Sequence, residues 1–188
     1  GRVVLAHALF HLDDLTGGSE ATIIMDSGAA VIILSSTGKS RIEPSLSVGK
    51  GARMTLGIDL TLISKAQVAG ELMLNGDGLV LENGAVVYNT SAVLNVVSAT
   101  VGGTVNVTSG TLNCTGAGAV FTGTVVAKRP LTSSDTAVVN ISAGTFAGLE
   151  LNSNYKGEDV DANITGGSFV ISAEQEPVPY VLRATLTV

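Results

Sequence analysis

The stretch NISAGTF at residues 140–146 returns as NITGGSF at residues 163–169. The two copies begin 163 − 140 = 23 residues apart, and both place asparagine, isoleucine, glycine and phenylalanine at the same relative positions. A phrase that recurs at such a distance is typical of repeat architectures, in which equivalent residues of successive repeats become neighbours in space. The pair therefore predicts stacked turns in this part of the chain.

A looser form of the pattern extends toward the N-terminus. Glycine-led apolar segments begin at residues 51, 70, 84, 103, 123, 144 and 167, with steps of 19, 14, 19, 20, 21 and 23 residues. Short strands at this spacing favour a chain wound around a long axis, in which each strand pairs with the strands above and below it. The step of 14 suggests that Gly84 marks a different corner of the path. At roughly 22 residues per turn, the whole chain would make about eight turns.

The composition agrees with an all-β fold. The chain has 188 residues, of which 45% are hydrophobic but only 4% aromatic, and it contains 23 glycines and no tryptophan. The core must therefore be built from Val, Leu, Ile and Ala, and the abundance of glycine with few charges suits strands and turns. The net charge of −6 argues against a nucleic-acid partner. The longest apolar run, residues 29–34, is too short to cross a bilayer, so no membrane span is expected in this segment.

The residues that the two copies share are expected to form vertical ladders. Phenylalanines and isoleucines would stack inward, asparagines would bond from one turn to the next, and glycines would occupy bends that exclude a Cβ atom. The pairs are Asn140 with Asn163, Ile141 with Ile164, Gly144 with Gly167, and Phe146 with Phe169.

One domain is expected over residues 1–188, with an N-terminal cap at 1–20, coils at 21–172, and a break followed by a terminal strand at 173–188. Residues 3–15 fit either a helical face or a strand face, and either could cover the first turn. Pro177 and Pro179 remove backbone donors, which is a usual way to end a strand ladder.

The repeated phrase resembles a known family. NISAGTF and NITGGSF, the second followed by Pro179-Tyr180-Val181, are similar to the I-[ST]-G-G-[ST]-F units of large adhesin-like bacterial cell-wall proteins. The resemblance covers about 138–182 and, as a looser pattern, 48–126; Ala143 departs from it at the first glycine of the pair. It implies a right-handed parallel β-helix, a pectin-lyase-like solenoid, that is extracellular and non-catalytic. No catalytic residues come with it.

A few residues could carry chemistry. The loop with Glu158, Asp159 and Asp161 has carboxylates dense enough for Ca²⁺, although it matches no EF-hand, and a solvated bend is the alternative. Tyr155 and Tyr180 are candidates for saccharide binding, with packing over the last turn as the alternative, and Tyr88 is also expected to be exposed. His7 and His11 have metal-ligand spacing only if they share a helix. The single cysteine, Cys114, is interpreted as a small buried hydrophobe.

An enzyme is the rival hypothesis, because parallel β-helices also carry polysaccharide lyases and glycosidases. Such enzymes need paired acids, or acids with a base, at defined distances. The candidates do not recur at one position of the coil: Arg41, Arg53, Lys128, Arg129, Asp135, Glu150 and Asp159.

We therefore expect a stiff stalk or an adhesive segment of a bacterial cell-surface protein, located outside the cell. Its partner would be a glycan or a protein of a host or neighbouring cell, and no cofactor is expected unless the acidic loop holds Ca²⁺. A monomer is expected, with a trimeric fibre as the alternative. The runner-up function is a carbohydrate-active β-helix, either a polysaccharide lyase or a glycan-binding module.

Overall fold

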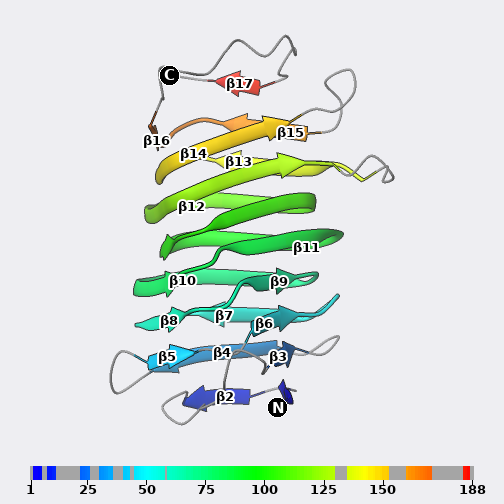
Figure 1. The fold of residues 1–188 in the computed structure, drawn as a ribbon, viewed down its shortest axis with the longest axis vertical. Coiled ribbons are helices and arrows are strands. Elements are labelled where there is room, and N and C mark those ends of the chain that lie inside the picture. Colours follow the sequence, from blue (N-terminus) through cyan, green and yellow to red (C-terminus); the bar gives the residue numbers. More distant parts are fainter. Residues whose placement is uncertain are drawn as a thin grey trace.

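The computed structural model in Figure 1 shows strands stacked in successive rungs along one long axis. The structure describes residues 45–57, 59–129, 135–151 and 160–170 with their side chains. It describes the backbone alone for residues 2–5, 8–11, 22–25, 30–35, 40–42, 152 and 184–186. All strand pairings in this part of the chain are parallel, so the fold is an all-β solenoid, a parallel β-helix.

The strands fall into three vertical files, which we number by their order along each turn. File 1 contains β1 (Arg2–Leu5), β3 (Thr22–Met25), β6 (Ser45–Val48), β9 (Ala66–Val68) and the beginnings of β11 (Ala85–Val101) and β12 (Thr104–Lys128). File 2 contains β2 (Ala8–His11), β4 (Ala30–Ser35), β7 (Arg53–Leu56), the beginning of β10 (Glu71–Leu81), the middles of β11 and β12, β13 (Ala137–Ile141), β15 (Val160–Ile164) and β17 (Ala184–Leu186).

File 3 contains β5 (Ser40–Ile42), β8 (Leu60–Leu62), the ends of β10 and β11, a later part of β12, the beginning of β14 (Thr145–Asn152) and β16 (Ser168–Phe169). The second half of β14 pairs with the last residues of β12. Several strands continue around corners, so β12 runs without interruption for 25 residues.

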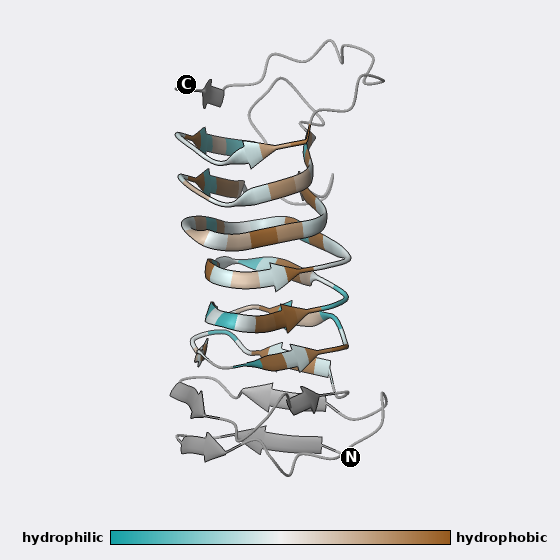
Figure 2. Cartoon of the chain, turned by 90° about the vertical axis from the view of Figure 1, so that its left-hand side faces the viewer, coloured by the Kyte–Doolittle hydropathy of each residue, from teal (hydrophilic) through white to brown (hydrophobic). Residues whose placement is uncertain are grey.

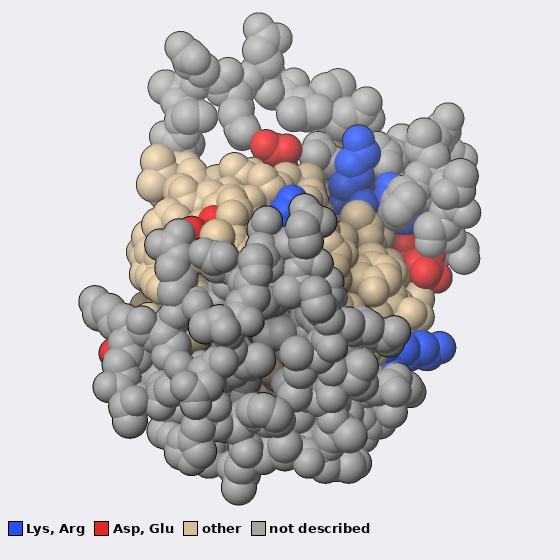
Figure 3. All heavy atoms as spheres, turned by 60° about the horizontal axis from the view of Figure 1, so that its bottom comes forward, with Lys and Arg blue, Asp and Glu red and all other residues tan. Residues whose placement is uncertain are grey.

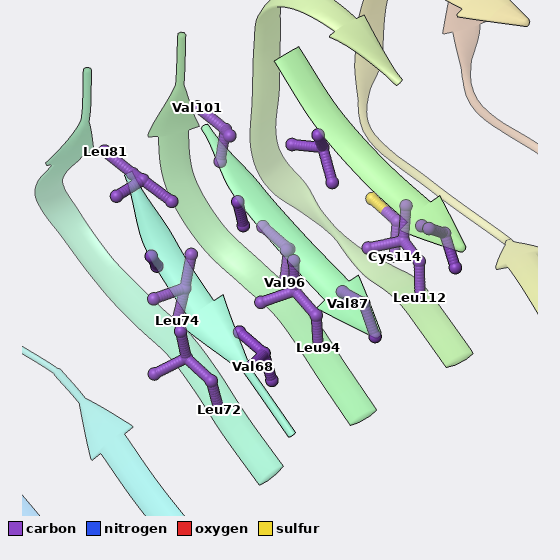
Figure 4. Packing of buried hydrophobic residues seen from close by; sticks show 14 of the residues in the cluster. Val68, Leu72, Leu74, Leu81, Val87, Leu94, Val96, Val101, Leu112 and Cys114 are labelled. Atoms are coloured by element: carbon purple, nitrogen blue, oxygen red, sulfur yellow. The ribbon is translucent and has the colours of Figure 1, made fainter. Parts of the chain in front are cut away.

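The core forms because side chains alternate between the inside and the outside of the coil. In β13 the burial pattern alternates without a break, with Ala137, Val139 and Ile141 buried. Register then places equivalent residues over one another: Leu72 pairs with Leu94, and Leu94 with Leu112. These side chains point into the space between the strands in Figure 4, and Figure 2 shows apolar segments recurring from rung to rung. The result is one continuous aliphatic core.

In the part of the chain that is described with its side chains, the number of turns is about five, against the eight expected for the whole length. From β7 to β15, file 2 passes through five steps between rungs within the fully described part of the chain. The expected number of turns assumed that every turn of the 188-residue chain has the same length. The steps are in fact unequal: Leu94 to Leu112 is 112 − 94 = 18 residues, and Leu112 to Val139 is 139 − 112 = 27 residues.

The glycine-led segments belong to different corners. Gly51 and Gly70 precede file 2, Gly84 and Gly103 precede file 1, and Gly144 precedes file 3. The glycines spaced by about twenty residues therefore lie at three different corners of the coil and do not form one vertical series. The inference that Gly84 marks another corner is correct, but Gly144 and Gly167 mark a third.

The N-terminal residues that fitted either a helix or a strand form strands where the structure describes them. Strand β1 pairs with β3 and strand β2 pairs with β4, both in parallel. His11 is the last residue of strand β2, whereas His7 lies outside the described residues. In the described part of the chain, no helix has the length and apolar character to span a membrane.

Candidate functional surfaces

The phenylalanines of the repeated phrase form an inward stack. The ring centroids of Phe146 and Phe169 are 5.1 Å apart with an interplanar angle of 15°, and their backbones are in register. Phe121 adds a third ring, 4.7 Å from Phe146 and inclined by 10°. Sequence reasoning missed Phe121 because its surroundings, AVFTG, do not repeat the phrase. Phe146 is fully buried and Phe169 is half-buried.

The isoleucines and glycines lie where the repeat requires them. Ile141 and Ile164 are in register and buried. Gly144 and Gly167 have φ angles of 103° and 102°, a region that side-chain-bearing residues rarely adopt. A Cβ at Gly144 would also lie 2.8 Å from Cys114 Sγ. These glycines therefore turn the chain into file 3 at a corner packed closely against the rung below.

The asparagines form a polar ladder on the outside of file 2. Asn140 is in register with Asn163, and Asn140 Nδ2 donates to Asn113 Oδ1 at 2.9 Å. Asn113 Nδ2 in turn donates to Asn95 Oδ1 at 2.8 Å. Asn95 Nδ2 donates to Glu71 Oε1 at 3.2 Å.

Sequence reasoning found Asn140 and its register partner Asn163, but it missed Asn95 and Asn113. A signal for the others exists in the sequence, because each asparagine lies between two inward residues. The triplets are Leu94-Asn95-Val96, Leu112-Asn113-Cys114, Val139-Asn140-Ile141 and Ala162-Asn163-Ile164.

The ladder ends on an ion pair. Glu71 Oε2 lies 3.2 Å from Arg53 Nε, and the Arg53 side chain is 77% exposed. Arg53 and Glu71 are register partners on β7 and β10. An exposed pair of this kind contributes little to stability.

The residues proposed for calcium and for sugars lie mostly outside the described residues: Glu158, Asp159, Tyr155 and Tyr180. Asp161 is described, and it is exposed on β15 in register with Val138. Within the described ranges, no three His, Cys, Asp or Glu residues are grouped so that they could hold a metal. The calcium hypothesis therefore stays a prediction about the loop before β15.

Tyr88 is the largest exposed aromatic side chain among the described residues, at 46% exposure. It is in register with Ser109, which is buried and whose Oγ donates to Asp135 Oδ2 at 3.3 Å. After Tyr88 the chain turns sharply, because Asn89 Oδ1 accepts from the backbone N and the Oγ of Ser91. Tyr88, Ser109 and Asp135 thus follow one another up the corner between files 1 and 2.

Cys114 is buried in file 2, as expected for a small hydrophobe. Its Sγ donates to Ala143 O at 3.0 Å. Burial raises the pKa of this thiol from 9.0 to about 12, because the charged thiolate loses its hydration. The thiol therefore stays protonated at neutral pH and is a poor nucleophile.

The charged residues considered for catalysis are spread over several elements. Arg53 begins β7 in file 2, whereas Lys128 ends β12 and Glu150 lies in β14. Arg53 is engaged with Glu71 and Asp135 with Ser109. On the face seen in Figure 3, basic and acidic side chains of the described residues are few and interspersed.

Comparison with known proteins gave no match: no protein-family model, curated protein or solved structure is significantly similar to this chain.

Proposed function

We propose that this chain is a non-catalytic segment of a bacterial cell-surface protein, acting as a stiff stalk or as the scaffold of an adhesive surface. The observation that carries the proposal is the vertical register of the rungs within each file, from β7 to β15 in file 2 and from β8 to β16 in file 3. A load along the axis of such a coil is shared by many backbone hydrogen bonds and by the core between them.

The interior supports this mechanical role. In the described part of the chain, Ser109 is the only buried polar side chain, and no buried side-chain nitrogen or oxygen lacks a hydrogen-bond partner. A dry core with satisfied polar groups resists local opening, and local opening is what a protease needs. The resemblance of residues 138–182 to adhesin-like units supports placing the rod outside a bacterial cell.

Limited proteolysis of the full chain tests the stalk. We expect no rapid cleavage within β10, β11, β12 or β13 under conditions that digest an unfolded chain. The Phe146→Ala variant is the matched control and should be cleaved within the rungs at a higher rate. Rapid cleavage of the unaltered protein inside β10, β11 or β12 would contradict a rigid rod.

The assembly state needs its own measurement. A single chain in solution should give a mass near 18.9 kDa by light scattering. Three times that mass would favour the trimeric fibre instead of a monomeric stalk.

The second candidate is a carbohydrate-active β-helix, and the exposure of Tyr88 is the observation that favours it. An exposed tyrosine ring offers an apolar face on which a sugar can stack.

A glycan array, combined with a lyase screen on acidic polysaccharides with and without Ca²⁺, separates the candidates. Turnover would favour an enzyme. Retention that is lost in Tyr88→Ala and kept in Tyr88→Phe would favour a binding module at this corner. Absence of both glycan binding and turnover would favour the stalk.

A further inference from the structure

The amide ladder, which we define as Asn95, Asn113 and Asn140, has a single direction. In each hydrogen bond the later asparagine donates through Nδ2 and the earlier one accepts through Oδ1. The first asparagine, Asn95, continues the same direction by donating to Glu71. All three side-chain amides therefore point their N–H groups toward the N-terminal end of the coil.

The two ends of an asparagine side chain have similar shapes, so the amides alone do not fix this direction. A carboxamide presents an acceptor at one end and donors at the other, and turning every amide around would give an equally long chain of hydrogen bonds. Turning only one around would place oxygen against oxygen at one junction and nitrogen against nitrogen at the next. The ladder therefore changes direction as a unit or not at all.

Glu71 removes this ambiguity. An ionised carboxylate only accepts hydrogen bonds, so Asn95 must present its Nδ2 to Glu71 Oε1. Asn95 then presents Oδ1 to Asn113, which must donate, and the same constraint passes to Asn140. Arg53 contacts the other oxygen of the carboxylate, Oε2, and leaves Oε1 for the ladder.

We propose that Glu71 is a positioning residue that sets the direction of the amide ladder through three successive rungs, so that the outer face of file 2 presents one fixed pattern of donors and acceptors. Asn163 is in register with Asn140, so it is the position at which the ladder would continue toward the C-terminal end. The proposal concerns the pattern of polar groups on the rod and does not depend on which function is correct.

The test uses the full chain labelled with ¹⁵N and ¹³C. Couplings across hydrogen bonds identify which carbonyl carbon accepts from each asparagine Nδ2. In the unaltered protein we expect one set of side-chain amide peaks, with couplings from Asn95 to Glu71, from Asn113 to Asn95 and from Asn140 to Asn113.

The Glu71→Gln variant keeps the length of the side chain but introduces an amide that can donate as well as accept. We expect a second set of peaks for all three asparagines, with couplings in the reverse direction. Arg53→Gln is the matched control: it removes the ion pair but leaves the carboxylate, so one set of peaks should remain.

Glu71→Leu removes the acceptor altogether. We expect the Asn95 coupling to position 71 to disappear and the peaks of Asn113 and Asn140 to shift or double. A single set of peaks with unchanged direction in Glu71→Gln, or a change confined to Asn95 in Glu71→Leu, would overturn the proposal. Thermal unfolding of each variant checks that these readouts come from folded protein.

Discussion

Phe121 and Phe146 lie face to face with their ring centroids 4.7 Å apart, although 146 − 121 = 25 residues separate them in the chain. Register explains the contact, because Phe121 in β12 pairs with Phe146 in β14. Phe146 also stacks on Phe169, so its ring has an aromatic neighbour on each side. Such pairs contribute beyond the area that they bury.

Truncation of the central ring should be costly. We expect Phe146→Ala to lower the free energy of unfolding by about 3–5 kcal/mol, because the cavity would lie within a closed core. Phe169→Ala should cost less than this, since that ring is half-buried. Chemical denaturation of both variants provides the measurement, and an equal or reversed order of the two losses would contradict the described stack.

The ladder should not tolerate a carboxylate in its middle. Asn113→Asp places an acceptor-only group opposite Asn95 Oδ1, and we expect a loss of about 1–3 kcal/mol at neutral pH. Acidification should relieve part of this loss, because a protonated carboxyl group can donate. Asn106→Asp, on the outside of file 1, is the control and should change stability by about 0.5 kcal/mol or less. Equal losses in the two variants would show that the ladder is not the cause.

Gly144 and Cys114 should be energetically coupled. Gly144→Ala introduces a Cβ at a φ of 103°, only 2.8 Å from Cys114 Sγ, and should cost about 1–3 kcal/mol. In a Cys114→Ala background the contact with Sγ is removed, whereas the 3.0 Å contact with Ala119 O and the backbone strain remain, so the same substitution should cost less. A double-mutant cycle measures the difference, and a coupling energy of zero would contradict the predicted contact with Cys114.

Cys114 should be unreactive in the folded protein. A disulfide reagent at about pH 8 should modify it only after denaturant is added, because the thiolate is the reacting form. Reaction of the native protein at the rate of a free thiol would contradict the described burial.

The same thiol should make stability depend on alkaline pH. Its pKa is about 12 in the folded chain and 9.0 ordinarily, so the unfolded chain loses the proton first. Stability should therefore fall as the pH rises from 9.0 toward about 12, and this component should be absent in Cys114→Ala.

Much of the architecture was predictable because it depends on local patterns. Alternating inward and outward residues gave the strands, and the repeated phrase at 140–146 and 163–169 gave their vertical register. The number of turns was not predictable in the same way. The polypeptide between β12 and β13 lengthens one step without changing the stacking of the rungs that it connects.

The residues of the amide ladder were also only partly predictable from the sequence. Asn140 and Asn163 were recognisable because their surroundings repeat, whereas Asn95 and Asn113 share only a pair of apolar neighbours with them. Glu71 carries no repeat signal, and it becomes part of the ladder only because β10 lies below β11.

The order of residues by itself determined that this chain forms strands, that its core is aliphatic and that its turns stack, since each follows from side-chain period and composition. Only the tertiary structure decided which corner each glycine occupies, which residues extend the two ladders and where the amide ladder ends. The reason is physical: a rung can take up extra residues at its corners without disturbing the backbone pairing above and below. Distance along the chain therefore does not by itself identify vertical neighbours.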